Sequence, residues 1–265
     1  MPSNFVAAGP EAYDAQMGRW SRRLAVPFLD FAGSPEGERV LDVGCGTGNL
    51  ALALLARGAR CVDAIDFDAG FVEAVRARSQ DARLKAQVGD ACALPYADGT
   101  FDRALSMLVF HFVSDAGRAI AEMRRVLRPG GVAAATVWDT YGGMPAVRMF
   151  QDTAAAIAPE AHARRESQTM RPMTREGELK AAFEAEGFRD VSDTMLTIRM
   201  DFESFDDFWI PTTQLHGATS AFMASLAQAT RGSIEAAVRA AYLCGRPDGP
   251  RGFVSAAWAV RGMAP

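Results

Sequence analysis

The chain has 265 residues, of which 49% are hydrophobic and 23% are charged, with a formal net charge of −4. This length and balance indicate one globular domain, or one domain with an embedded cap, and the net negative charge argues against nucleic acid as a partner. With neither a leader-like N-terminus nor a long uncharged apolar segment, we expect a cytoplasmic protein without a membrane span. The cysteines lack C-x-x-C spacing, which favours reduced thiols over a metal site.

Residues 1–35 are predicted to form an N-terminal helical segment. Leu24, Phe28 and Phe31 follow one another at near-helical spacing after an aromatic and basic stretch. The simplest interpretation is a helix that packs its aromatic side on the core.

A short apolar strand, 39–43, is followed by three glycines on alternate positions and then by a helical pattern from Leu50 onwards. A strand, a glycine turn and a helix N-terminus together direct backbone N–H groups at a ligand. The spacing differs from the dinucleotide fingerprint, because Asn49 stands where that fingerprint needs its third glycine.

The next predicted strand, 61–66, ends in Asp66, 24 positions after Asp42. In open parallel sheets an acid at the end of the second strand accepts hydrogen bonds from ribose hydroxyls. Asp63 is the competing carboxylate, but its place within the strand is expected to turn it away from the carboxyl edge. Asp68 is interpreted as the N-cap of the following helix.

Further strands are predicted at 84–88, 103–108 and 132–138, with room for a helix between successive strands. Right-handed crossovers then give a parallel sheet with the glycines and acids on one edge. Asp90 comes just after the strand at 84–88 and joins that edge.

Four motifs occur in this order: D-x-G-x-G-x-G from Asp42, L-P-Y-A-D-G-T-F-D from Leu94, H-F-V from His111 and L-R-P-G-G from Leu127. Over roughly residues 12–140 the chain resembles the class I S-adenosylmethionine-dependent methyltransferases, in their ubiquinone/menaquinone-biosynthesis (type 11) branch. The resemblance implies an α/β, doubly wound, Rossmann-like sheet of seven strands with an antiparallel last strand. Residues 36–200 and 251–265 would form this domain, with late strands at 191–200 and 253–261 and a helix at 174–188.

The resemblance also implies S-adenosylmethionine as the cofactor and a set of residues around it. An N-terminal tyrosine and an aromatic–basic pair are expected over the cofactor: Tyr13, Trp20 and Arg22. The glycine loop and the strand ends are expected to supply the other cofactor-binding residues: Asp42, Gly44, Cys45, Gly46, Gly48, Asp66, Phe67, Asp90, Ala91, Ser106 and Met107.

Residues 201–250 are rich in phenylalanine, tryptophan and methionine and are inserted before the last strand. We interpret them as a helical cap, both packing on itself and lining the substrate pocket. A further helix is predicted at 145–157.

His111 is the one titratable residue expected just beyond strand four. It is a candidate general base, because an unperturbed histidine titrates near pH ~6.5. The alternative is a hydrogen-bonded structural residue between Phe110 and Phe112, and the sequence leaves both open.

The sequence thus predicts methyl transfer to a small organic acceptor, at oxygen or carbon rather than nitrogen. Residues 106–111 lack the Pro-Pro-aromatic motif of enzymes that methylate amino groups of nucleic acids. Two alternatives remain: a non-catalytic S-adenosylmethionine-binding protein and, less favoured for want of a Tyr-x-x-x-Lys pair, a nicotinamide-dependent oxidoreductase. Monomer and homodimer are both open.

Overall fold

The computed structural model describes residues 9–215 and 218–265. Within them seven strands form one sheet in the order β3-β2-β1-β4-β5-β7-β6. β7 is antiparallel to both of its neighbours and the other pairings are parallel, which confirms the predicted fold class. The strands are β1 (Arg39–Val43), β2 (Cys61–Asp66), β3 (Leu84–Val88), β4 (Phe101–Met107), β5 (Leu127–Trp138), β6 (Arg189–Phe202) and β7 (Arg251–Met263).

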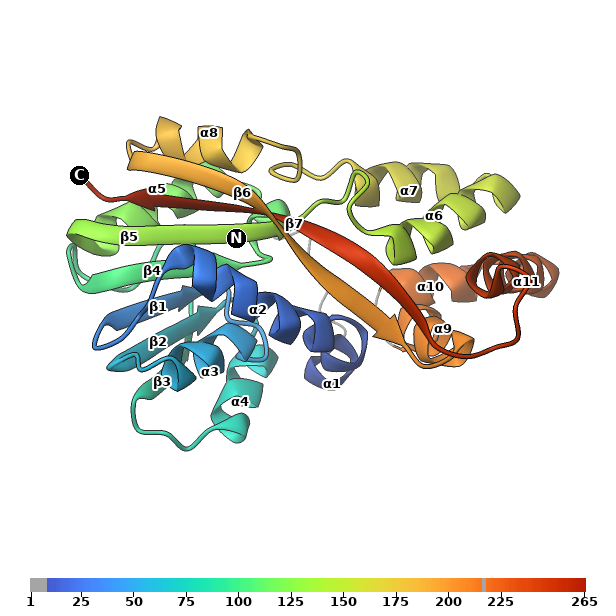
Figure 1. The fold of residues 1–265 in the computed structure, drawn as a ribbon, viewed down its shortest axis with the longest axis horizontal. Helices are drawn as coiled ribbons and strands as arrows, with labels where there is room; N and C mark the ends of the chain where they lie inside the picture. The colour runs from blue at the N-terminus through green and yellow to red at the C-terminus, as the bar shows by residue number, and fades with distance from the viewer. Residues whose placement is uncertain (1–8, 216–217) are drawn as a thin grey trace.

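Helices cover both faces of this sheet (Figure 1). On one side of the sheet lie α2 (Arg19–Ala32), α3 (Asn49–Ala56) and α4 (Ala69–Arg78). On the other side lie α5 (Ala116–Val126) and α8 (Glu178–Ala185). Val40, Leu41 and Val43 of β1 are fully buried, because a parallel strand between two helix layers has no solvent face.

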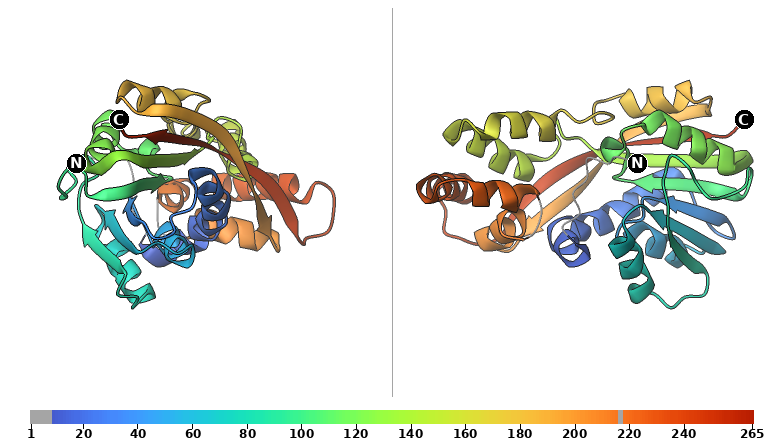
Figure 2. Two further views of the ribbon diagram at one scale, coloured as in Figure 1. Left: turned by 60° about the vertical axis from the view of Figure 1, so that its left-hand side comes forward. Right: turned by 180° about the vertical axis from the view of Figure 1, so that it is seen from behind.

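The remaining helices lie beyond the carboxyl ends of the parallel strands (Figures 1 and 2). They are α1 (Pro10–Tyr13), the π-helical turn η1 (Asp14–Gly18), the 3-10 turn η2 (Phe110–Phe112), α6 (Pro145–Ile157), α7 (Ala161–Thr169), α9 (Phe205–Thr213), α10 (Ala218–Ser225) and α11 (Gln228–Leu243). The helix predicted at 145–157 is confirmed by α6, and Asp68 caps α4 by accepting hydrogen bonds from two backbone N–H groups.

β6 and β7 are longer than the strands predicted at 191–200 and 253–261. β5 ends at Trp138, which pairs with Ala257, and the part of β7 before Ala257 pairs with β6 alone. This two-stranded extension places α9–α11 opposite α6 and α7 (Figure 1). Phe150 of α6 and Trp209 of α9 are in edge contact there, with ring centroids 6.1 Å apart.

Other predicted bounds also differ from the structure, among them β4, which spans Phe101–Met107 rather than 103–108. The helix expected at 174–188 is shorter, because the Thr174 hydroxyl hydrogen-bonds the Arg171 carbonyl and the Thr140 hydroxyl, and α8 begins only after Gly177. β5 starts at Leu127 rather than 132, since Leu127 already pairs with Phe101. None of these differences alters the order of the sheet.

Candidate cofactor and acceptor site

A cavity of about 330 Å³ lies at the carboxyl edge of the sheet. Its walls come from the ends of β1, β2 and β4, from the loop after β3, and from α6, α7, α9 and α10. Nine of the predicted site residues line it: Tyr13, Gly44, Gly46, Asp66, Phe67, Asp90, Ala91, Met107 and His111. The tertiary structure therefore brings most of the predicted set into one space.

The glycine loop forms one wall of the cavity with backbone that other residues rarely adopt. Gly44, Gly46 and Gly48 have φ of 75°, 51° and 87°, in the left-handed region that favours glycine. A Cβ on Gly44 would lie 2.3 Å from a methyl carbon of Val109, so a side chain there would collide with the chain after β4. The loop can therefore approach both β4 and a ligand closely.

Asp66 ties this loop to the end of β2. Its carboxylate accepts hydrogen bonds from the N–H groups of Gly46 (2.9 Å) and Asp68 (3.0 Å). Burial raises its pKa, and these N–H donors oppose the shift. Two donors leave lone pairs on the carboxylate unused, and these are available to a pair of ribose hydroxyls.

The N-terminal segment is clamped onto the glycine loop through η1. The Thr47 hydroxyl donates a 2.7 Å hydrogen bond to Asp14, and Arg78 reaches both Asp14 and the Thr47 carbonyl. Asn49 donates to the Gly18 carbonyl at 2.9 Å. Single π-helical turns occur frequently at functional sites, and this one brings the preceding Tyr13 to the cavity wall.

Trp20 and Arg22 do not line the cavity. Trp20 is 3% exposed and packs edge-on against Phe202, with ring centroids 5.2 Å apart. Arg22 is exposed on α2. Helical spacing explains this outcome, because α2 turns its aromatic side to the core and only the turn before it reaches the cavity.

Cys45, Gly48 and Ser106 support the site without lining it. The Ser106 hydroxyl is fully buried and donates to the Val43 carbonyl at 2.9 Å, which joins β4 to β1. Gly48 is the N-cap of α3, and Cys45 is buried in the core on the same side of the sheet. These residues hold the shape of the loop.

Asp42 lies beneath the loop with no exposed surface. Neither of its carboxyl oxygens has a hydrogen-bond partner among the described residues. Burial, and then the negative charge of Asp66, raise the pKa of Asp42 to about 8. A buried carboxyl without partners is costly to ionise, so Asp42 is held mainly protonated at neutral pH.

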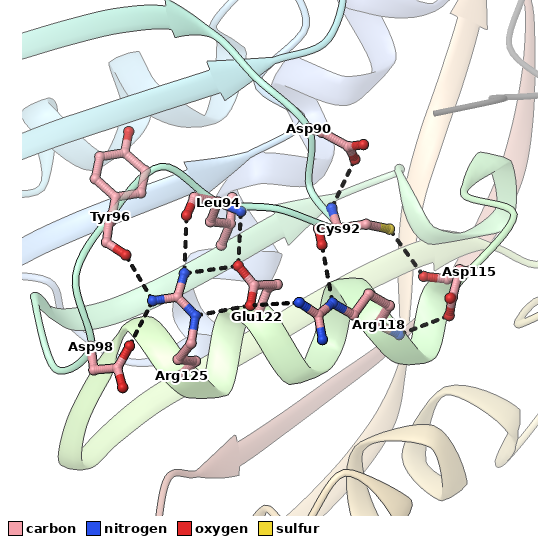
Figure 3. A network of polar contacts seen from close by, with 9 residues as sticks. All are labelled: Asp90, Cys92, Leu94, Tyr96, Asp98, Asp115, Arg118, Glu122 and Arg125. Atoms are coloured by element: carbon pink, nitrogen blue, oxygen red, sulfur yellow. Dashed lines mark hydrogen bonds and ion pairs between the residues drawn. The ribbon is translucent and has the colours of Figure 1, made fainter.

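Asp90 is positioned by a network between the loop after β3 and α5 (Figure 3). Asp90 accepts a hydrogen bond from the Cys92 N–H at 2.8 Å. Glu122, 5% exposed, accepts from the Leu94 N–H at 2.8 Å and from Arg125. Arg125 in turn donates to the Leu94 carbonyl. Two side chains of α5 therefore bind both the N–H and the carbonyl of Leu94 and hold the loop in place.

His111 lines the cavity but is only 4% exposed, with its ring 4.0 Å from that of Phe112. Its Nδ1 has no hydrogen-bond partner within the described ranges. Burial, and then the positive charge of Arg171, lower the pKa of His111 to about 3. The imidazole is therefore neutral at pH 7 and a weak base, suited to hydrogen-bonding an acceptor more than to taking its proton.

The chain turns sharply where β4 ends. Leu108 has φ of 67°, a conformation that costs a branched residue about 1–3 kcal/mol. Its N–H bonds the Thr136 carbonyl at 2.7 Å, which fixes the turn. Met107 and Val109 thereby both face the cavity, on the side of the glycine loop.

The part of the cavity away from the glycine loop is lined by Thr212, Leu215 and Thr219, which fall in the segment predicted to line the pocket, and by residues before 201 that sequence reasoning missed. Apolar side chains come from several elements, and polar ones come chiefly from α6, α7 and the loop that follows: Met144, Val147, Gln151, Arg164, Gln168, Arg171, Thr212, Leu215 and Thr219. The sequence signal among the missed residues is the spacing of Arg164, Gln168 and Arg171 at i, i+4 and i+7, which would place these three residues on one side of a helix. Without knowledge of where α7 packs, that spacing looks the same as a solvated helix face.

The geometry accommodates an adenosine-type cofactor. Asp66 ends β2 and Asp90 follows the adjacent strand β3, the Gly44 backbone leaves no room for a side chain, and the apolar residues Phe67 and Ala91, next to the two acids in the sequence, also line the cavity. This donor and acceptor set matches ribose and an adenine amino group.

Within residues 9–215 and 218–265 no helix is long and apolar enough to cross a membrane.

Comparisons with known proteins agree with this geometry. Residues 41–135 match the family model described as "Methyltransferase domain". A demethylmenaquinone methyltransferase from Renibacterium salmoninarum is 40% identical over 116 residues, 44% of this chain and 46% of that protein. A malonyl-[acyl-carrier protein] O-methyltransferase from Geobacter sulfurreducens is 35% identical over 189 residues, 70% of this chain and 67% of that protein.

The solved structure of the YcgJ protein from Bacillus subtilis has the same fold, with a TM-score of 0.57 at 20% identity over 92% of this chain and 98% of that one. Fold, loop and acids together define a Rossmann-like nucleotide-cofactor protein. The chain belongs to the class I S-adenosylmethionine-dependent methyltransferases, a family whose methyl donor is S-adenosylmethionine. It spans about half the length of the first curated relatives it matches, and its own acceptor is a separate question.

Proposed function

We propose that this protein transfers the methyl group of S-adenosylmethionine to a small organic acceptor, at oxygen or carbon. The observation that carries the proposal is a single cavity with two unlike ends. One end holds the glycine loop, Asp66 and Asp90, and the other is walled by α6, α7, α9 and α10. The relatives whose names specify C- and O-methylation of small or carrier-bound molecules support the same reaction class.

S-adenosylmethionine, when bound, supplies a methyl group on a positively charged sulfur. The residues of the chain have to align and shield the reactants, since alignment alone provides effective molarities on the order of 10⁵ M or more. Asp66 would hold the ribose, and Asp90 with Ala91 the adenine. Met107 would border the transfer point, and the acceptor's displaced proton would leave to solvent, because neutral His111 is too weak a base to keep it.

We further propose that three segments of the chain have separate roles. Of the segment predicted at 1–35, residues 1–8 lie outside the described residues, and the part from residue 9 onwards covers the cofactor end through Tyr13 and the Asp14–Thr47 hydrogen bond. Residues 36–200 and 251–265 form the Rossmann-like methyltransferase domain. Residues 201–250 act as the cap over the acceptor, supported by Thr212, Leu215 and Thr219 on the cavity wall.

Two measurements test the proposal in order. Calorimetry with S-adenosylmethionine, S-adenosylhomocysteine and NAD is expected to show micromolar binding of the first two alone, a scale typical of cofactor sites. A screen of small acceptors is then expected to show S-adenosylhomocysteine formation. Saturation by NAD alone would overturn the cofactor, and tight S-adenosylmethionine binding without turnover on any acceptor would favour a non-catalytic binding protein.

A further inference from the structure

Two arginines on the wall of the acceptor end have no carboxylate partner among the described residues. Of the arginines between 148 and 175, Arg148 and Arg165 both pair with Asp152, at 3.0 and 2.5 Å. Arg164 and Arg171 form no ion pair with any described residue, although both face the cavity. The acids among the lining residues are Asp66 and Asp90, which belong to the cofactor end.

Both arginines are instead held in place by neutral groups. Arg164 donates to the Thr219 hydroxyl at 2.6 Å and lies over the Phe222 ring, 5.4 Å from its centre. Arg171 donates to the Gln168 side-chain carbonyl at 2.7 Å and lies 4.6 Å over the Phe112 ring. These contacts orient the guanidinium groups, but no carboxylate in the described part of the chain forms an ion pair with either of them.

The two charges are also partly removed from water. Both side chains are half-buried, and the Arg164 Nε is fully buried with no hydrogen-bond partner among the described residues. Burial lowers the pKa of both, and the proximity of Arg164 lowers that of Arg171 further. Two neighbouring positive charges that are half-buried repel each other more strongly than in water, because desolvation strengthens electrostatic interactions. Desolvation also strengthens their attraction to an anion, so a bound anion would stabilise the pair.

We propose that the acceptor is an organic oxyanion with an apolar body, whose carboxylate or phosphate group is bound by Arg164 and Arg171. This inference rests on the proposed function and names its substrate class. A planar guanidinium binds either oxyanion in bidentate fashion. Met144, Val147 and Leu215, which line the same end, would contact the apolar body.

The test uses the full-length protein saturated with S-adenosylhomocysteine and matched probes. Phenyl, naphthyl and octyl bodies are each titrated as the carboxylate, the phosphate monoester and the neutral carboxamide. At least one body is expected to bind tenfold or more tightly as an anion than as its amide. The better of the two anions identifies whether the site takes a carboxylate or a phosphate.

Variants assign the preference to the two arginines. Arg164→Gln and Arg171→Gln are each expected to lose the anion preference by tenfold or more, whereas Arg165→Gln, whose charge already pairs with Asp152, is expected to keep it. Because an unbalanced charge is removed, the first two are expected to melt no lower than wild type without ligand. Equal affinity for anion and amide on every body, or an unchanged preference in both arginine variants, would overturn the proposal. Failure of S-adenosylhomocysteine to bind would instead count against the proposed function, and the titrations are then repeated on the ligand-free protein.

Discussion

Asp14 accepts a 2.7 Å hydrogen bond from the Thr47 hydroxyl. The two residues are far apart in the sequence, and their contact joins the N-terminal segment to the glycine loop. Arg78 completes the contact by an ion pair with Asp14 at 3.1 Å. Thr47 is 1% exposed, so its hydroxyl depends on Asp14 for a partner. The cofactor loop is thus held from outside the sheet as well as by Asp66 from within.

A double-mutant cycle on this pair tests whether the N-terminal segment shapes the cofactor site. Asp14→Ala and Thr47→Val are each expected to weaken S-adenosylhomocysteine binding, with a coupling energy of about 1 kcal/mol, because each removes the same hydrogen bond. Calorimetry of the two single variants, the double variant and wild type gives the coupling. Additive losses would show that the two residues act on the loop independently.

Asp66→Ala is expected to weaken S-adenosylhomocysteine binding by about 1.5–3 kcal/mol, since a charge-assisted contact to the ribose is lost. Asp63→Asn serves as the control. Asp63 is on the same strand but pairs with Arg39 at 3.1 Å, away from the cavity, so its removal is expected to leave the dissociation constant unchanged. A folded Asp66→Ala protein with wild-type affinity would remove this residue from the ribose site.

The raised pKa of Asp42 makes stability depend on pH in a defined direction. The folded pKa is about 8, whereas an unfolded aspartate titrates near ~3.9. Between these values the folded state keeps a proton that the unfolded chain releases, so stability falls as pH rises, by up to about 1.4 kcal/mol per pH unit. Asp42→Asn is expected to lack this component. Urea unfolding of both proteins at pH 5 and pH 8 measures it, and parallel pH dependences would contradict the expectation.

The loop that carries Asp90 is expected to depend on Glu122. Glu122→Ala leaves the Leu94 N–H without its acceptor and removes the carboxylate that pairs with Arg125, which is expected to cost about 1–3 kcal/mol of stability and to weaken cofactor binding. Glu184, whose side chain is 54% exposed in a loose 3.9 Å pair with Lys180, is the matched control, and Glu184→Ala is expected to change stability by less than about 0.5 kcal/mol. Equal effects of the two variants would show that the network does not hold the loop.

His111 is expected to contribute no ionisation to the pH–rate profile between pH 5 and pH 8. Its pKa of about 3 keeps it neutral over that range, so a rate limb near pH 6.5 is not expected from it. His111→Ala is expected to lower turnover through lost positioning of the acceptor, with the shape of the profile unchanged. Disappearance of a limb near pH 6.5 in this variant would restore His111 as the general base.

The sequence by itself predicted the parallel part of the sheet, because apolar strand patterns, alternate glycines and acids at strand ends are local signals. The seventh, antiparallel strand was implied by the resemblance to the methyltransferase family. Gly44, Gly46 and Asp66 could be assigned from these local signals alone, since only glycine tolerates that turn and a strand's end fixes which edge its acid joins. The neutral state of His111 could not be assigned, because it results from burial and from Arg171, sixty residues further on. Packing likewise decided the Asp14–Thr47 hydrogen bond, the exposure of Arg22 and the lack of an ion pair between any described residue and Arg164 or Arg171. Whether an arginine is solvated, paired or turned into a cavity depends on long-range contacts, here on the β6–β7 extension that sets α9 and α10 opposite α7, and no local pattern encodes them.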